Sequence, residues 1–150
     1  MNIMILSNSS YAGYGYSTVT KYVAKGLRDV GHKVVVVGMQ TLGKPIKDEL
    51  GNVNIPICFD AWCGDFLHHY LRAYKTQILI TILDVWLEQT RFIQNAVNLN
   101  RCKWLCHVTI NTDPISNFLV EKIINADRII APSIFNYNML SHVGLSLIHI

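Results

Sequence analysis

Polar and glycine residues that could bind an anion or position a reacting group stand directly after several apolar segments of the chain. The backbone N–H groups of a glycine-rich loop can hold an anion, and a carboxylate directly behind a buried strand needs a hydrogen-bond partner or water. We therefore expect eight residues to belong to a site. They are Gly13, Tyr14, Gly15, Asp84, Trp86, Asn111, Asp113 and Ser133.

Most of these residues also have a purely structural explanation. Gly13 and Gly15 can serve a tight turn without contacting any ligand. Asp113 precedes a proline and can cap a helix, which would not prevent it from facing a ligand. Ser133 can cap a helix in the same way. Asp84 is the hardest of the group to explain by structure alone.

Short apolar runs alternate with longer amphipathic segments along the chain, a pattern that predicts strands and helices in turn. Such alternation predicts an α/β fold with a doubly wound parallel sheet covered on both faces. The expected strands are 2–6, 34–37, 53–59, 78–83, 104–110 and 128–131. The expected helices are 17–30, 65–74, 87–99, 113–125 and 133–143.

The first of these helices follows the glycine loop. Ser17 or a close neighbour is expected to cap its start, and Gly31 suits the left-handed position after its end. Apolar residues at helical spacing predict the face that packs on the sheet. That face comprises Val19, Tyr22, Val23, Leu27 and Val30.

The carboxyl ends of parallel strands meet at one edge of a sheet, and open α/β sheets bind their ligands there. The loop 13–15 follows the first expected strand, Asp84 follows the run ILITIL, and Asn111 and Ser133 follow two later strands. We therefore expect the candidate residues to converge on this edge.

The spacing of Gly13 and Gly15 suggests the GxGxxG motif of dinucleotide enzymes, but the match fails. The sixth position of the motif is Thr18 instead of glycine, and Gly13 lies well beyond the strand end at Leu6. The second strand ends in the sequence VGMQ, without the acid that binds a ribose hydroxyl. These departures argue against NAD.

Composition and charge restrict the class of protein. With 150 residues, 51% of them hydrophobic, the chain can bury the core of one domain. No apolar run approaches the roughly 18–20 residues of a membrane-spanning helix, and the N-terminus lacks the features of a secretory signal. The net charge of +3 includes no dense basic tract, so nucleic-acid binding is not expected. We expect a cytoplasmic protein, with peripheral contact to anionic lipid left open.

The four cysteines do not predict a metal site. Zinc bound by Cys102, Cys106 and His107 is conceivable, but the last two are neighbours on an expected strand and would point to opposite faces. Cys58 and Cys63 also form no CxxC pair. We expect reduced and mostly buried thiols, and no metal.

Two segments resemble the retaining glycosyltransferases of the GT-B fold, the large group that includes glycogen synthase-like and mannosyltransferase-like enzymes. YAGYGYSTVTKYVAKGLRDVGHKVVVVG resembles the opening of their N-terminal domain, with a glycine-rich loop, a helix ending in Gly-His and an apolar strand. ADRIIAPSIFNYNMLSHVG resembles the end of that domain. The resemblance implies that residues 1–144 are a Rossmann-like, acceptor-side domain, one half of a two-domain enzyme.

The resemblance also implies roles for individual residues. Residues 13–15 would lie near the phosphates of the sugar nucleotide and near the acceptor. Asp84 stands where the family commonly has a His-Asp pair, although Leu83 replaces the histidine. Asn111 stands where many members place an active-site histidine in a T-x-H pattern, and Asp113-Pro114 matches an alternative form with an aspartate before proline.

Family membership would make the complete protein a hexosyltransferase that moves a sugar from a nucleotide-sugar donor to a carbohydrate, lipid or protein acceptor. Judging by the family, it would need no metal and no cofactor. The leaving diphosphate would be stabilised largely from the C-terminal domain. The acidic pair that grips the donor would also lie in that domain. No sugar transfer is expected from this polypeptide alone.

The last six residues, LSLIHI, have two interpretations. They match the apolar strand that leads to the hinge in the family, and they also match the translation of a common sequencing adapter, in which case the native sequence stops near Gly144. Two rival functions also stay open. One is a stand-alone Rossmann-like module that binds a nucleotide or a protein without catalysis, and the other is an epimerase-like enzyme of the same fold.

Overall fold

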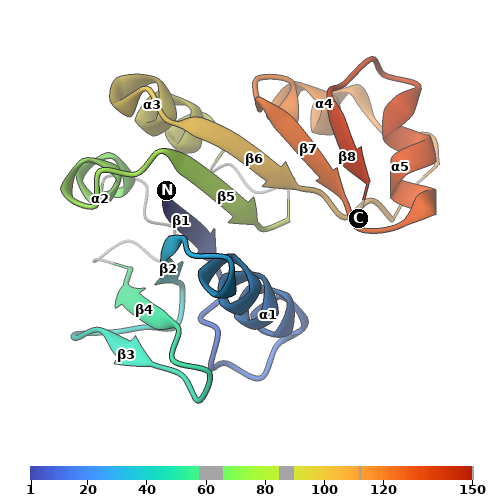
Figure 1. Cartoon of the computed structure of the whole chain (residues 1–150). Helices are drawn as coiled ribbons and strands as arrows, with labels where there is room; N and C mark the ends of the chain where they lie inside the picture. Colours follow the sequence, from blue (N-terminus) through green and yellow to red (C-terminus); the bar gives the residue numbers. More distant parts are fainter. Residues whose placement is uncertain (58–65, 85–89, 112, 150) are drawn as a thin grey trace.

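The computed structural model describes residues 1–57, 66–84, 90–111 and 113–149 and has the expected α/β fold. Within these residues, five helices and eight strands alternate for most of the chain (Figure 1). The strands are β1 (Asn2–Ser7), β2 (Lys33–Gly38), β3 (Ile46–Lys47), β4 (Val53–Pro56), β5 (Ile78–Ile82), β6 (Lys103–His107), β7 (Arg128–Ala131) and β8 (Leu147–His149). The helices are α1 (Gly15–Asp29), α2 (Leu67–Ala73), α3 (Thr90–Asn100), α4 (Asn117–Ile123) and α5 (Ile134–Ser141).

All described strands form one sheet in the order β3-β4-β2-β1-β5-β6-β7-β8. Every neighbouring pair is parallel except β3 and β4, which pair antiparallel at the edge. From β1 the chain first adds β2, β3 and β4 on one side of the sheet. It then returns past β1 and adds β5, β6, β7 and β8 on the other side. This reversal beside β1 is the position where sheets of this kind open a crevice for a ligand.

Side chains of β1 alternate between the two faces of the sheet. Ile3 and Ile5 belong to the core cluster that packs against α1. Met4 and Leu6 belong to a larger cluster, to which α2, α3, α4 and α5 contribute buried residues. The expectation of a doubly wound sheet covered on both faces is therefore confirmed.

Helix α1 packs on the sheet through part of the face predicted from the apolar period, together with small and polar residues. Val19, Val23 and Leu27 of that face are partly buried and pack against the core cluster. Ser17, Thr20 and Ala24 are buried, whereas Tyr22 and Val30 are 62% and 70% exposed. The buried strip of the helix therefore centres on small side chains, with Val19, Val23 and Leu27 beside them, and excludes Tyr22 and Val30.

A chain of hydrogen bonds fixes α1 against the centre of the sheet. The Thr20 hydroxyl donates to Ser7 Oγ at 2.6 Å, and the Ser7 hydroxyl donates to the carbonyl of Ile82 at 2.9 Å. These groups join α1, the end of β1 and the end of β5, so the first turns of α1 are held at the carboxyl edge.

Three local predictions were wrong. Helix α1 begins two residues before Ser17, after Tyr14, whose side chain forms no cap. Helix α4 begins at Asn117 instead of Asp113, because Ser116 is extended and its Oγ accepts from the N–H of Leu119. The connection before β4, for which the sequence predicts a loop, contains the short strand β3.

Two local predictions are confirmed. Ser133 caps α5, with its Oγ accepting from the N–H of Asn136 at 3.1 Å. Cys102 and Cys106 are free and buried thiols, and burial raises the pKa of Cys106 to about 12. Cys58 and Cys63 lie outside the described residues. No helix in the described part of the chain is long and apolar enough to cross a membrane.

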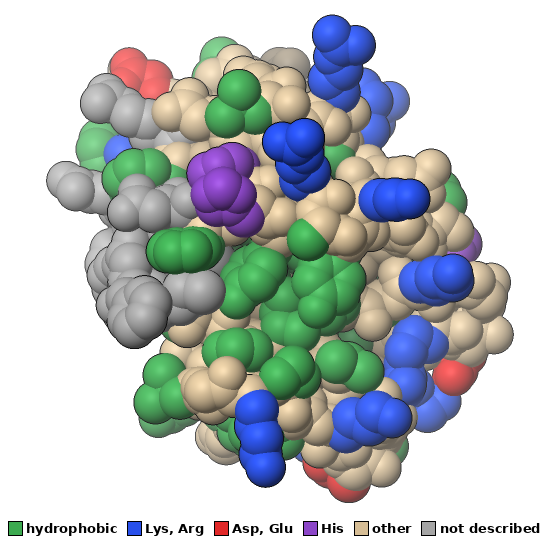
Figure 2. Space-filling model, turned by 90° about the vertical axis from the view of Figure 1, so that its left-hand side faces the viewer, with side chains coloured by type: hydrophobic (Ala, Val, Ile, Leu, Met, Phe, Trp, Pro, Cys, Tyr) green, Lys and Arg blue, Asp and Glu red, His purple; other side chains and the backbone are tan. Residues whose placement is uncertain are grey.

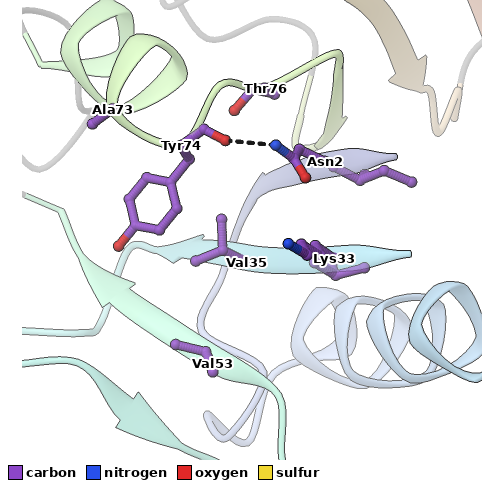
Figure 3. A pocket seen from close by; sticks show the side chains of 9 residues that line it. Asn2, Lys33, Val35, Val53, Ala73, Tyr74 and Thr76 are labelled. Atoms are coloured by element: carbon purple, nitrogen blue, oxygen red, sulfur yellow. Dashed lines mark hydrogen bonds between the residues drawn. The ribbon is translucent and has the colours of Figure 1, made fainter. Parts of the chain in front are cut away.

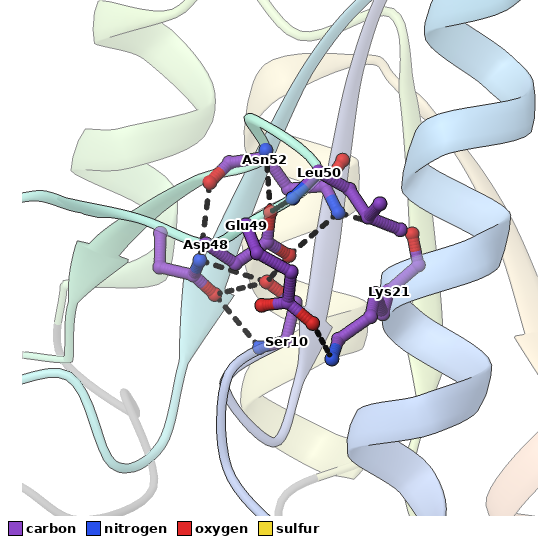
Figure 4. Close-up of polar contacts among 7 residues, drawn as sticks. Ser10, Lys21, Asp48, Glu49, Leu50 and Asn52 are labelled. Carbon is purple, nitrogen blue, oxygen red and sulfur yellow. Dashed lines mark hydrogen bonds and ion pairs between the residues drawn. The ribbon is translucent and has the colours of Figure 1, made fainter.

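The loop after β1 is held by a buried polar network around Asp48 (Figure 4). The Asp48 carboxylate accepts from the hydroxyl of Ser10 at 2.6 Å, the side chain of Asn52 at 2.7 Å, and the N–H groups of Leu50 and Asn52 at 2.9 and 2.8 Å. The side-chain oxygen of Asn54 accepts from the N–H of Ser10 at 2.8 Å. Burial alone would raise the pKa of Asp48, but these hydrogen bonds outweigh burial and lower it.

Helix α1 supports the same segment from its outer side. The Arg28 guanidinium donates to the carbonyl oxygens of Leu50 and Gly51 at 2.6 and 2.7 Å, and Lys21 forms an exposed ion pair with Glu49 at 2.5 Å. The segment 48–52 thus connects the loop after β1 to the body of α1.

Gly38, the last residue of β2, marks a close approach to the loop after β1. A Cβ atom at this position would lie 2.8 Å from Thr41 Oγ1, 2.9 Å from Ser9 Cα and closer still to Ser9 Oγ. Real Cβ atoms do not approach backbone atoms so closely, so this packing requires glycine.

We expect Gly38→Ala to destabilise the fold by about 1–3 kcal/mol, because the loop holding Ser9 would have to move. The matched control is Gly26→Ala, at an exposed position inside α1 where a Cβ atom would meet nothing within 4 Å. That change should stabilise the fold by about 0.5–1 kcal/mol, because alanine favours the helix. Urea unfolding of the three proteins measures both effects, and equal midpoints for the parent and Gly38→Ala would contradict the packing argument.

We expect Asp48→Asn to destabilise the fold by about 2 kcal/mol at neutral pH, because buried donors lose their acceptor. The pKa of Asp48 is lower in the folded chain than in the unfolded chain. Its stabilisation is therefore complete above about pH 4 and is lost as the pH falls through the folded pKa. Unfolding free energy measured against pH should fall less steeply in acid for the variant. Asp29→Asn, which removes only an exposed ion pair with Lys25, should change stability by less than about 0.5 kcal/mol.

Candidate functional site

A cavity of about 670 Å³ opens at the carboxyl edge of the sheet, beside the reversal at β1. Its volume lies in the range of about 300–1,000 Å³ that is typical of small-molecule sites. It draws on the loop after β1, the first turns of α1, the ends of β6 and β7 and the first turn of α5. The lining residues are Asn8, Tyr14, Gly15, Tyr16, Val19, His107, Thr109, Pro132, Ser133 and Asn136.

One wall of the cavity is the N-terminus of α1. Tyr14 precedes the helix with extended backbone and forms no side-chain cap, and the first turn contains no acidic residue. The first backbone N–H groups of a helix have no partner within the helix and carry a partial positive charge. This end of α1 therefore offers uncompensated donors to an anionic group.

Another wall is the N-terminus of α5. Asn136 is 3% exposed, and its side-chain amide donates to the carbonyl of Ile110 at 2.9 Å. Its backbone N–H donates to Ser133 Oγ. These two bonds fix α5 to the segment that follows β6, and they leave the Ser133 hydroxyl hydrogen free to donate.

Tyr16 connects α1 to the end of β5. Its hydroxyl donates to the Asp84 carboxylate at 2.6 Å. Burial, the hydrogen bond to Asp84 and the charge of Asp84 together raise the pKa of Tyr16 to about 12, and a hydrogen bond with Thr109 acts in the opposite direction. Tyr16 is therefore a protonated hydrogen-bond donor at any physiological pH.

His107 forms part of the floor at the end of β6. It is 8% exposed, and Nδ1 has no hydrogen-bond partner among the described residues. Burial lowers the pKa of its imidazole, which is therefore neutral at pH 7. The other lining side chains carry no formal charge, so the cavity combines neutral polar groups with the apolar surfaces of Tyr14, Val19 and Pro132.

The structure brings together some of the residues expected from the sequence. Tyr14, Gly15 and Ser133 line the cavity, and Asp84 reaches it through Tyr16. Gly13 lies one residue outside the lining, in a loop where a Cβ atom would meet nothing within 4 Å. A site role stays a prediction for each of them.

The two residues expected to act in catalysis lie at the same edge but not in the lining. Asn111 and Asp113 are exposed, in the connection between β6 and α4. Trp86 lies outside the described residues. A catalytic role for Asn111 or Asp113 stays a prediction, as does substrate binding by Trp86.

Sequence reasoning missed Tyr16 and His107. The sequence pattern places Tyr16 at the end of the loop after the first strand. Its signal is its position in the same glycine-rich segment as Tyr14 and Gly15. His107 was considered only as a zinc ligand, although an imidazole at the end of a buried strand has the same need for a partner that drew attention to Asp84. Among the described residues, no group of three His, Cys, Asp or Glu side chains could hold a metal ion.

A second hollow, of about 410 Å³, lies at the opposite edge, where Asn2, Lys33 and Val53 begin their strands (Figure 3). The side-chain amide of Asn2 already donates to the carbonyls of Tyr74 and Lys75, at 3.1 and 3.2 Å. Figure 2 shows the face of the molecule that carries α2 and β4. Apolar side chains gather in the middle of this face, and Lys and Arg side chains lie around them. We place the candidate site at the carboxyl edge, where polar groups are still available.

Comparison with solved structures relates the fold to nucleotide-sugar enzymes and to other Rossmann-like proteins. Sucrose-phosphate synthase from Thermosynechococcus elongatus has a TM-score of 0.69 at 14% identity, over 99% of this chain and 87% of that one. An alpha-glucosyltransferase in complex with UDP and DNA has a TM-score of 0.56 at 14% identity, over 99% of this chain and 40% of that one. UDP-glucose 4-epimerase from Thermotoga maritima has a TM-score of 0.52 at 10% identity, over 87% of this chain and 54% of that one.

No protein-family model and no curated protein matches the sequence. At 10–14% identity, the likeness to solved structures establishes the Rossmann-like fold and no more. The chain spans about half or less of the length of the glucosyltransferase and the epimerase.

We expect Tyr16→Phe to destabilise the fold by about 1–2 kcal/mol, because Asp84 loses a short hydrogen bond from a part-buried hydroxyl. The control is Tyr14→Phe, since Tyr14 is 58% exposed and its hydroxyl has no hydrogen bond to a described residue. That change should stay within about 0.5 kcal/mol of the parent. Thermal unfolding of both variants tests the pair, and equal stabilities would show that the Tyr16–Asp84 contact does not hold α1.

Proposed function

We propose that this chain is the N-terminal, acceptor-side half of a retaining glycosyltransferase that uses a nucleotide-sugar donor. The observation that carries the proposal is the cavity at the carboxyl edge. Two helix N-termini flank it, the first turn of neither contains an acid, and its side chains are neutral. Such a site suits a ligand that joins an anionic group to an uncharged, hydroxyl-rich ring. The likeness to sucrose-phosphate synthase over most of both chains is consistent with this proposal.

In this proposal the N-terminus of α1 holds the phosphates of the donor. The backbone N–H groups of Gly15 and Tyr16 are available there, and the loop from Gly13 to Tyr14 brings them to the mouth of the cavity. Ser133 offers its hydroxyl from the facing helix. Asp84, after β5, and Trp86 are further substrate-binding residues in this proposal.

Catalysis in this proposal depends on orientation more than on acid–base chemistry by this half. Asn111 and Asp113 hydrogen-bond the acceptor and align its hydroxyl with the anomeric carbon. The bond from that carbon to the diphosphate breaks as the new glycosidic bond forms on the same face, and the leaving diphosphate takes the proton of the acceptor. Holding the reactants in this geometry supplies a large part of such a rate enhancement.

The rest of the proposal concerns the complete protein. Residues 1–144 form the acceptor-side domain, and a second α/β domain holds the nucleotide with a pair of glutamates. The enzyme requires neither a metal nor a cofactor, acts in the cytoplasm on a carbohydrate, lipid or protein acceptor, and binds no nucleic acid. Contact with a membrane surface would follow from a lipid acceptor.

An epimerase-like function is the second candidate, because UDP-glucose 4-epimerase is among the structural neighbours. The sequence counts against it. The GxGxxG motif is incomplete at Thr18, and no acid follows β2 where it would bind the ribose of NAD. A stand-alone nucleotide- or protein-binding module remains the rival if no second domain exists.

The test begins with the coding sequence of the source locus beyond codon 144. We expect a second α/β domain there and release of nucleoside diphosphate from a panel of nucleotide sugars by the complete protein. Asp113→Ala and Gly15→Val should each lower kcat/KM at least about tenfold, equivalent to about 1.4 kcal/mol. Gly26→Ala, on the same helix as Gly15 but away from the cavity, should leave kcat/KM unchanged.

Two results would contradict the proposal. A native stop codon near Gly144 would favour the binding module. Full transfer activity in both Asp113→Ala and Gly15→Val would show that the site lies elsewhere, because neither residue is needed for folding: Asp113 is exposed, and a Cβ atom at Gly15 would meet nothing within 4 Å.

A further inference from the structure

His107 is a buried polar group that the fold itself does not use. The residue is 8% exposed, and its backbone lies between Ile82 of β5 and Ile130 of β7 in the sheet. A histidine kept for structure normally has partners for its ring nitrogens. Nδ1 of His107 has none among the described residues and is itself buried. Since the residue lines the cavity, a ligand there would meet the edge of the ring that carries Nε2.

The state of the imidazole restricts what it can bind. Burial lowers its pKa, and contact with the backbone of His107 itself only partly offsets this. The ring is therefore neutral at pH 7, with one N–H and one lone pair. A neutral imidazole suits a hydroxyl group, which can both donate and accept, better than it suits a phosphate.

The groups around His107 fit the same kind of ligand. Thr109 and the Ser133 hydroxyl are neutral hydrogen-bonding groups, and Asn136 retains a carbonyl oxygen because its amide nitrogen bonds Ile110. The rings of Tyr14 and Tyr16 add flat apolar surface. A sugar ring carries hydroxyls around its rim and C–H groups on its faces, so it matches both features.

We propose that His107 is a specificity-determining residue that hydrogen-bonds one hydroxyl of a neutral sugar in this cavity through the Nε2 edge of its ring. The proposal rests on the proposed function, since it assigns the substrate class of the same cavity. It places the uncharged ring of the substrate on the β6–β7 side and leaves any phosphate to the N-terminus of α1.

The experiment uses the 150-residue chain labelled with ¹⁵N histidine and the probe methyl α-D-glucopyranoside. Long-range ¹H–¹⁵N NMR reports the protonation and tautomer of each imidazole. We expect a neutral His107 ring at pH 7 and a saturable shift of its Nε2 resonance as the sugar is added. Inorganic phosphate should instead shift the backbone amides of Gly15 and Tyr16 and leave the His107 ring unchanged.

Two variants separate ligand binding from packing. His107→Leu should weaken sugar binding at least about tenfold, while its melting temperature stays equal to or above that of the parent, because the change removes a buried group without a partner. His107→Gln retains a side-chain hydrogen-bonding group and should recover part of the affinity. If His107→Leu does not fold, the NMR titration of the parent chain and of His107→Gln still decides the question.

The proposal is overturned if the sugar leaves the His107 resonance unchanged, or if His107→Leu binds the sugar as tightly as the parent. A charged His107 ring at pH 7, or a shift caused by phosphate alone, would also overturn it. These outcomes differ from a failure of the proposed function. Sugar binding at His107 can be found in a protein without transferase activity, and transfer can be found in an enzyme whose His107 variants bind normally.

Discussion

The parallel pairing of β2, β1, β5, β6 and β7 is the constraint on which the site depends. Parallel strands end at the same edge, and helices that connect them run back in the opposite direction, so their N-termini meet at that edge too. One requirement of topology therefore gathers Tyr16, His107 and Ser133 from distant parts of the chain. No contact among these residues had to be specified separately.

The position of α1 needs more than the sheet, because a loop of several residues separates it from β1. Gly38 allows Ser9 to pack directly on the end of β2, and Asp48 binds Ser10 from the other side. The two aspartates that contact this part of the chain, Asp48 and Asp84, therefore have different roles. Asp48 has its hydrogen-bonding capacity filled by the protein and is structural, whereas Asp84 stands at the edge with Tyr16 as its one described partner.

Strands with strong apolar patterns could be predicted from the sequence, and β7 has the bounds that its β-branched run indicated. Features that depend on long-range contacts could not. The buried strip of α1 centres on Thr20 and Ala24 and excludes Tyr22, although Val19 and Leu27 of the predicted face do pack against the core. Ser116 is used as the helix cap instead of Asp113, a choice between two good local signals that only the surrounding chain decides. The convergence of Tyr14, Gly15 and Ser133 followed from the parallel topology, but the burial of His107 depends on neighbours from β5 and β7.

The two edges of the sheet differ in how their helix dipoles are compensated. At the amino edge, basic residues stand in the last turns of three of the described helices, namely Arg28 in α1, Arg72 in α2 and Lys122 in α4, whereas α3 and α5 have none there. At the carboxyl edge, the first turns of α1 and α5 contain no acidic residue to complement the positive ends. Three helices thus have a positive charge near their C-terminal end, whereas α1 and α5 have no negative charge at the N-terminal end beside the cavity, and only α5 has a side-chain cap there. Because no lysine or arginine is among the described residues that line the cavity, an anion bound there would be held by backbone N–H groups whose direction is fixed by α1 and α5. Such groups select the position of a phosphate more strictly than mobile cationic side chains would, which is what the alignment of a donor with an acceptor hydroxyl requires.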